Sequence, residues 1–302
     1  MSFSASNRNF CMLLAASLLV WGHTLSTTFN LALRKDAYTH ILLIIPISIT
    51  LILLGRKKQT WKPVPSIRAG SALLVLAALI GIGGLRWGRA DILTGDVRLA
   101  IEMLAVVVWW IGSFVFCFGG KVFRQTLFPL LFLLWLIPMP EFALNRVIEL
   151  LQQDTASCAR GLFTIVSVPV TQNGTAVTVP GLTVEVAEEC SSIRSSMVLI
   201  VTSMVMSYLL LHSFWGRTIV TLAAIPLSAV KNGVRVFTLE GLAAYVNPAI
   251  LNSPLHHQGG VLFLAIALAA VFGLIAILSR LERKGAPPIG ANAPRLSISG
   301  IK

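Results

Sequence analysis

Residues 188–212 read EECSSIRSSMVLIVTSMVMSYLLLH, in which a polar stretch passes directly into an apolar run. Runs of about 20 apolar residues can cross the hydrocarbon core of a bilayer as helices. Further runs of this kind fill the chain of 302 residues, of which 56% are hydrophobic and only 12% are charged. This composition excludes an ordinary soluble domain and predicts a polytopic membrane protein.

The apolar runs predict an all-α fold with about eight transmembrane helices. The fifth run is short, and Pro138 and Pro140 mark its end. The predicted spans cover residues 10–29, 38–55, 70–87, 99–118, 126–140, 192–212, 217–239 and 259–280. We expect residues 1–280 to form one integral membrane domain and residues 281–302 to form a basic, disordered cytoplasmic tail.

The net charge of +12 could indicate a nucleic-acid partner, but the positions of the basic residues indicate membrane topology instead. Lys and Arg accumulate in alternate loops, beginning with the N-terminal one, as is typical of cytoplasmic loops. This orientation places every acidic residue except Glu282 at or near the outer face. We therefore expect a multi-pass inner-membrane protein that has membrane lipid, and no nucleic acid, among its partners.

Residues 141–190 form the one substantial segment between predicted spans, and the charge pattern places it outside the cytoplasm. Apolar residues at helical spacing predict an amphipathic helix over 142–167. The spacing then changes to two, which predicts a small hairpin before the sixth span. Its strands cover 168–170, 175–179 and 182–186, with turn residues at Asn173-Gly174 and Pro180-Gly181.

Cys190 stands where this extracytoplasmic segment enters the sixth span. Arg194 follows four residues later, on the same face of a helix that begins near Cys190. The helix N-terminus and the guanidinium both favour the thiolate, the nucleophilic form of cysteine. Glu189 and Ser191 flank the thiol and are candidate supporting groups. Other interpretations stay open: a small buried residue, a disulfide with Cys158, and an ion pair between Arg194 and a neighbouring glutamate.

Two further polar groups share the predicted depth of Cys190. Arg235 lies toward the outer end of the seventh span with Asn232 one turn before it. An intramembrane arginine is functional by default, and the alternative is a side chain that extends to the outer interface. His256 and His257 precede the eighth span. A cysteine nucleophile needs a charge partner, a donor to the oxyanion and an acid for the leaving amine, and these side chains can fill those roles. No motif predicts a cofactor, and two adjacent histidines without further ligands predict no metal site.

At these residues the chain resembles the exosortase/archaeosortase family over roughly 38–280. The resemblance rests on Val186-Ala187-Glu188-Glu189-Cys190-Ser191-Ser192-Ile193-Arg194-Ser195, on Asn232 to Arg235, and on His256 to Gly260 and Phe263. One departure is Ser192, where the family commonly has glycine.

The resemblance implies a membrane-embedded cysteine protease or transpeptidase that uses Cys190, Arg235 and a histidine, with its active site on the extracytoplasmic face. The spacing to Gly260 favours His256 over His257. The implied partners are exported proteins whose C-terminal tail carries a short motif, a transmembrane span and a basic cluster, which the enzyme cleaves.

Two alternatives from other classes remain. A transporter could line a pathway with Arg194, Arg235 and Glu102, and a structural subunit of an exopolysaccharide export system would give Cys190 no chemical role. The charged groups cluster at one face and no inverted repeat occurs, which favours the enzyme. Substitution of Cys190 by Ser separates the three, because only acyl transfer needs the sulfur.

Overall fold

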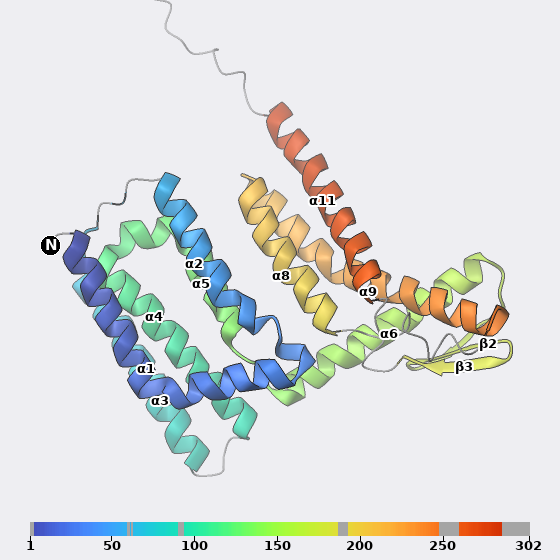
Figure 1. Ribbon diagram of the computed structural model, residues 1–302, viewed down its shortest axis with the longest axis horizontal. Coiled ribbons are helices and arrows are strands. Elements are labelled where there is room, and N and C mark those ends of the chain that lie inside the picture. The colour runs from blue at the N-terminus through green and yellow to red at the C-terminus, as the bar shows by residue number, and fades with distance from the viewer. Residues whose placement is uncertain are drawn as a thin grey trace, which may run out of the picture. The chain divides into compact units, whose positions relative to one another are not determined.

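The computed structural model of the chain consists of helices and one small sheet (Figure 1). It describes residues 3–58, 61, 63–89, 94–186, 193–247 and 260–285. The chain divides into two compact units, Met1–Leu150 and Leu151–Lys302.

The first unit is organised around α4 (Gly95–Gln125), against which α1 (Phe3–Arg34) and α3 (Ile67–Arg89) pack. The outer faces of these helices expose large apolar side chains, among them Leu19 at 89% and Leu79 at 61%. A protein in water rarely exposes so much contiguous apolar surface, whereas lipid tails solvate it well.

The remaining helices of the first unit connect at its edge. The short 3-10 helix η1 (Asp36–Tyr38) joins α1 to α2 (Ile41–Lys58). In turn, α2 packs on α5 (Leu127–Phe132) and on the 3-10 helix η2 (Leu133–Leu136). The hydroxyl of Ser48 fastens this contact by donating a hydrogen bond of 2.7 Å to the Pro129 carbonyl.

Two of the longest helices are broken by a residue with non-helical backbone angles. The break in α1 is at Trp21 (φ −115°, ψ 20°), and the break in α4 is at Gly119 (φ 84°, ψ 169°). Straight helices of this length would reach about 47 Å, well beyond the hydrocarbon core of about 30 Å. Each break separates a span from a segment that runs in another direction, as Figure 1 shows for α1. The break at Trp21 falls inside the predicted span 10–29, because hydropathy continues across it.

Seven helices in the described part of the chain are long and apolar enough to cross a membrane. An eighth candidate is a bent pair, in which Leu127–Leu136 and Glu141–Ile165 meet at 97°. The prediction of about eight transmembrane helices is confirmed. The predicted fifth span 126–140 is the irregular one, because Pro138 and Pro140 stand at the bend and cannot continue a helix.

In the second unit, α8 (Ile193–Leu210), α9 (Phe214–Tyr245) and α11 (Gly260–Gly285) pack on one another. These helices share one apolar cluster. It contains Leu199, Leu211, Val220, Ala267, Val271 and Ile275. The last helix runs to Gly285, so residues 281–285 of the predicted tail are helical, and the rest of that tail lies outside the described residues.

The predicted insertion is present as α6 (Glu141–Ile165) followed by an antiparallel sheet in the order β1-β2-β3. Its strands are β1 (Thr171–Asn173), β2 (Ala176–Val179) and β3 (Leu182–Glu185). The predicted first strand, 168–170, is wrong, and β1 lies directly after it. Pro169 has no N–H to donate, and Val168 and Val170 pack against the apolar cluster instead. That cluster joins the sheet to α6 and to Val236 of α9.

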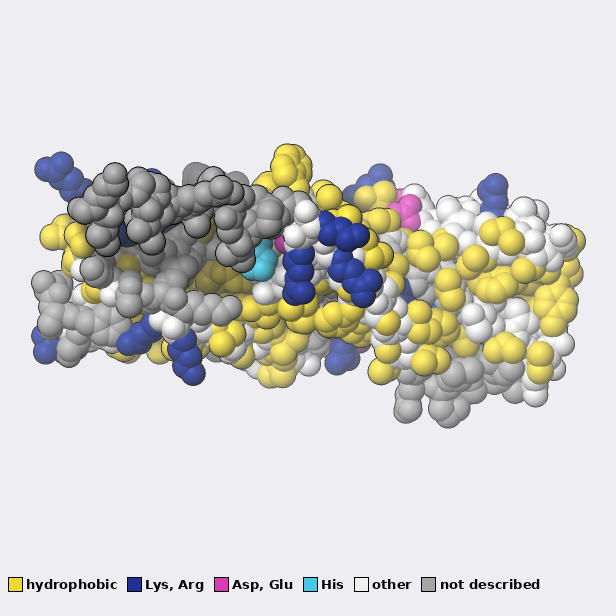
Figure 2. Space-filling model, turned by 90° about the horizontal axis from the view of Figure 1, so that it is seen from above, with side chains coloured by type: hydrophobic (Ala, Val, Ile, Leu, Met, Phe, Trp, Pro, Cys, Tyr) yellow, Lys and Arg dark blue, Asp and Glu magenta, His cyan; other side chains and the backbone are white. Residues whose placement is uncertain are grey.

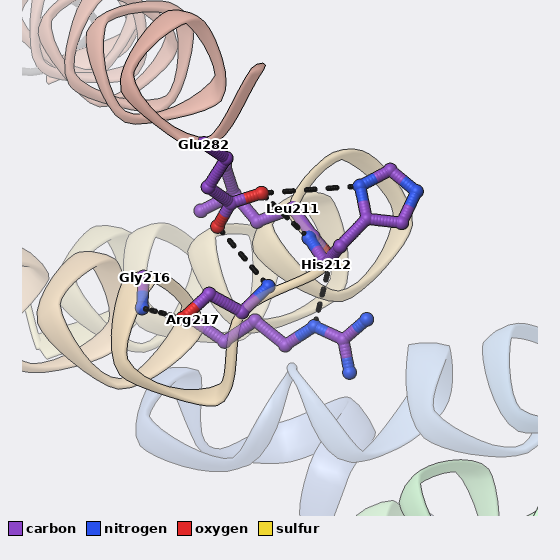
Figure 3. A network of polar contacts seen from close by, with 6 residues as sticks. Leu211, His212, Gly216, Arg217 and Glu282 are labelled. Carbon is purple, nitrogen blue, oxygen red and sulfur yellow. Dashed lines mark hydrogen bonds and ion pairs between the residues drawn. The ribbon is translucent and has the colours of Figure 1, made fainter. Parts of the chain in front are cut away.

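At one end of the second unit, the carboxylate of Glu282 connects α11 to the turn between α8 and α9 (Figure 3). Glu282 of α11 accepts hydrogen bonds from the backbone N–H groups of His212 at 2.9 Å and of Ser213 at 3.1 Å. These N–H groups precede α9, where a negative charge is favourable. Figure 2, which views the molecule from above, shows basic side chains among hydrophobic ones. Glu282 is the one acidic residue that the charge pattern does not place at or near the outer face, and its carboxylate is bound by backbone N–H groups.

Replacing Gly119 by Ala should destabilise the first unit. The new Cβ would lie 1.8 Å from the Val64 carbonyl oxygen, and φ at this position is +84°. Overlap with backbone plus a left-handed φ should cost at least about 2 kcal/mol. The measurement is thermal unfolding in detergent. Gly120→Ala is the matched control, since nothing lies within 4 Å of a Cβ there, and equal unfolding temperatures for the two variants would contradict the account.

Candidate active site

The middle of α9 buries a group of polar side chains. Lys231 and Arg235 are each 6% exposed, and Asn232 is fully buried. Lys231 and Arg235 are four residues apart and Asn232 is three residues from Arg235, so the three lie on one side of the helix. Arg235, which the sequence places within a span, is therefore buried in the second unit.

Lys231 joins this group of α9 to the beginning of α8. Its Nζ donates a hydrogen bond to Oγ of Ser195, in the first turn of α8. The hydroxyl of Ser196 next to it is also buried and accepts or donates no hydrogen bond within the described residues. Lys231 is not among the site residues predicted from the sequence. The available signal was a lysine within a predicted span, which is as unusual as the arginine one turn later.

Arg235 points toward the beginning of α11. A Cβ built on Gly260, the first residue of that helix, would lie 3.9 Å from Nη1 of Arg235. The starts of α8 and α11 thus both approach the same stretch of α9. In the sequence, α8 directly follows the segment that carries Cys190, and α11 directly follows the segment that carries His256 and His257.

The polypeptide that leads toward Cys190 is anchored at its last described residue. Val186 is fully buried, its N–H donates to the Thr175 carbonyl at 3.0 Å, and its carbonyl accepts from Nε2 of Gln152 at 2.8 Å. On the other side, Ile193 is buried at the start of α8. Both neighbours of the predicted nucleophile segment therefore have fixed positions within the second unit.

Five of the predicted site residues lie outside the described residues. They are Cys190, Glu189, Ser191, His256 and His257. Arg194 is described and is exposed at the first turn of α8, unlike the buried Arg235. Of the predicted residues that are described, the structure therefore buries Arg235 and Asn232 together and leaves Arg194 on the surface.

The opposite face of α9 is fixed by close packing on α6. A Cβ on Gly233 would lie 2.6 Å from both Cβ and Sγ of Cys158. Cys158 is a free thiol, which argues against the disulfide with Cys190. Burial raises the pKa of the Cys158 thiol, so this cysteine stays protonated at neutral pH and serves packing.

Glu102 has local partners in the first unit. Its carboxylate accepts a hydrogen bond of 2.8 Å from Nε of Arg98 and one of 2.7 Å from the Thr24 hydroxyl. Arg98, one helical turn away on α4, thereby neutralises the charge of Glu102. Glu102 is part of the contact between α1 and α4.

Within the described ranges, no three His, Cys, Asp or Glu side chains come close enough together to hold a metal ion. The polar groups near the starts of α8 and α11 are instead two cations, an amide and hydroxyls, and the buried acid of α9, Glu240, lies five residues beyond Arg235. Such a set can stabilise negative charge, which suits an oxyanion or a thiolate.

These helices and buried charges define a multi-pass membrane protein with a polar site on α9. A family model described as transmembrane exosortase matches residues 32–273. The chain therefore belongs to the transmembrane exosortase family. Searches of curated proteins and of solved structures each found no match.

Replacing Gly233 by Ala should separate α6 from α9 and displace Arg235, which lies two residues further on. We expect a loss of at least about 2 kcal/mol in unfolding free energy, because the overlap involves a Cβ as well as the sulfur. Gly273→Ala on α11 is the control, with nothing within 4 Å of its Cβ. The double variant Gly233→Ala/Cys158→Gly should recover part of the loss in thermal unfolding. Additive losses in the double variant would show that this contact is not the cause.

Proposed function

We propose that this transmembrane exosortase is a cysteine protease or transpeptidase that cleaves C-terminal sorting signals of exported proteins. The observation that carries the proposal is the approach of the starts of α8 and α11 to the buried cations of α9. The short separations along the chain also support the proposal. Four residues reach at most about 14 Å, and His256 precedes Gly260 by four residues. Cys190 precedes Ser195 by five residues.

The proposed reaction proceeds through a thioester. The Cys190 thiolate attacks the scissile carbonyl carbon, and the carbonyl electron pair moves onto oxygen, where Arg235 stabilises the oxyanion. The intermediate collapses, and the leaving amine takes a proton from His256. An amine or water then attacks the thioester, gives its proton to His256 and releases the thiolate.

The length of α9 supports a site at the outer membrane surface. From Phe214 to Arg235 the helix rises about 32 Å, close to the thickness of the hydrocarbon core. Beyond Arg235 the helix packs on the sheet through Val236 and Phe237. The Glu282 contact holds the opposite end, where Arg217 and the basic end of α11 lie. With that end in the cytoplasm, as the basic loops predict, Arg235 faces the outer leaflet of the inner membrane.

A substrate with a single transmembrane span would present its cleavage motif at this same depth. Its basic cluster would remain in the cytoplasm. The reaction as written needs no cofactor. A transporter is not favoured, because Glu102, one of its three expected charges, is already engaged by Arg98 and Thr24.

Lys231 adds a second positive charge to this proposed site. Burial of an ammonium costs several kcal/mol, and one charged hydrogen bond to Ser195 returns only about 1.5–3 kcal/mol. Stability therefore gives no reason for a lysine here. We assign it the role of stabilising the thiolate beside Arg235.

Cys190→Ser should lower substrate processing on the order of 10³-fold or more, because the serine hydroxyl stays protonated without a strong base. Processing is followed by gel shift of an exported protein of the same genome whose tail carries a motif, a span and basic residues. Trapping of a thioester to a tail peptide should succeed only with the original cysteine. Cys158→Ala is the matched control and should process normally. Retained processing in Cys190→Ser would refute the mechanism.

Lys231→Met should lower the processing rate at least about tenfold while the unfolding temperature stays equal or rises, because a buried charge is removed. Lys231→Arg keeps the charge and should retain most of the activity. A purely structural lysine predicts the reverse: a fall in unfolding temperature in parallel with activity.

A further inference from the structure

The first unit contains an apolar cavity of about 530 Å³ that the proposed reaction does not use. It lies between α1, α2, α4 and the segment formed by α5 and η2. Aromatic and aliphatic side chains form most of its wall, among them Phe10, Leu14, Ile49, Ile52, Phe114 and Phe118. All of its lining belongs to this one unit.

The cavity is about as deep as one leaflet of a bilayer. Its lining runs from Asn7 to Leu18 on α1 and from Ile45 to Arg56 on α2. At 1.5 Å per residue each stretch is about 16 Å long, half of a hydrocarbon core of about 30 Å. Figure 1 shows the first half of α1 and α2 running in opposite directions, so Asn7 and Arg56 lie at the same end.

The polar groups of the cavity are distributed unevenly. Asn7, the exposed Arg56 and Trp61 stand at one end, which is the arrangement expected where a membrane meets water. The two serines deeper in the cavity are engaged: Ser17 accepts from Trp110, and Ser48 donates to Pro129. The interior therefore offers an apolar surface, and the charge lies at the mouth.

The depth of the cavity does not match a transmembrane helix, which would need twice this depth to span the bilayer. A flexible hydrocarbon chain of one leaflet fits the depth.

We propose that this cavity binds one acyl chain of an anionic phospholipid, whose phosphate lies against Arg56. The occupant follows from charge complementarity, since a guanidinium at the mouth pairs with a phosphate and gains little from a neutral alcohol. The leaflet is the one at the Arg56 end, which the basic loops predict to be cytoplasmic. The site is thus separate from Arg235 and independent of the peptidase mechanism.

Lipid binding is tested with the full-length protein purified in detergent. Phosphatidylglycerol or phosphatidylcholine is titrated in, and native mass spectrometry and thermal unfolding report binding. Wild-type protein should bind phosphatidylglycerol saturably and more tightly than phosphatidylcholine. Ile49→Trp fills the cavity and should abolish saturable binding of both, and Arg56→Gln should raise the Kd for phosphatidylglycerol at least tenfold.

Matched controls separate this site from general lipid solvation. Leu54→Trp adds the same bulk on the same helix at a side chain that is 41% exposed and does not line the cavity. Lys57→Gln removes a charge adjacent to Arg56 but outside the lining. Both should bind within twofold of wild type. Equal binding by Ile49→Trp and Leu54→Trp, equal loss in Arg56→Gln and Lys57→Gln, or an Ile49→Trp defect in self-association with unchanged lipid binding would each overturn the proposal.

Discussion

Burial of positive charge on α9 is the constraint on which the second unit depends. An ammonium and a guanidinium one turn apart repel each other and lose hydration, so the fold must compensate with nearby polar groups and with negative charge when it develops. Ser195 supplies one such group. Buried positive charges of this kind can stabilise an anion, since they are in place before the anion forms.

The same helix serves two environments. Its first part packs with α8 and α11 through apolar residues such as Val220 and Ala267, and its last part belongs to the core beneath the sheet. The cations lie where one environment gives way to the other. The contact between Gly233 and Cys158 fixes the rotation of α9 at this point, so packing on one face determines where Lys231 and Arg235 point on the other.

The sequence was sufficient for features that depend on composition. Apolar runs predicted the spans because lipid selects for hydrophobicity alone, and Arg235 was singled out because charged residues are rare within spans. The break in α1 could not be predicted in this way, because Trp21 is equally apolar in a broken helix and in a straight one. Lys231 carried the same sequence signal as Arg235, a charge within a span, but its contact with Ser195 of another helix could not be predicted from the sequence. The position of β1 depended on the missing N–H of Pro169 and on tertiary packing of its neighbours.

Glu282 has a mechanical consequence for the second unit. It pins the end of α11 to the turn between α8 and α9, whereas the opposite end of α11 begins beside Arg235. Glu282 and Gly260 are separated by about 33 Å of helix, so a ten-degree tilt about the pinned end would displace Gly260 by about 6 Å. A small tilt of α11 about Glu282 would therefore change the separation of Gly260 and Arg235 while the contact at Glu282 is kept.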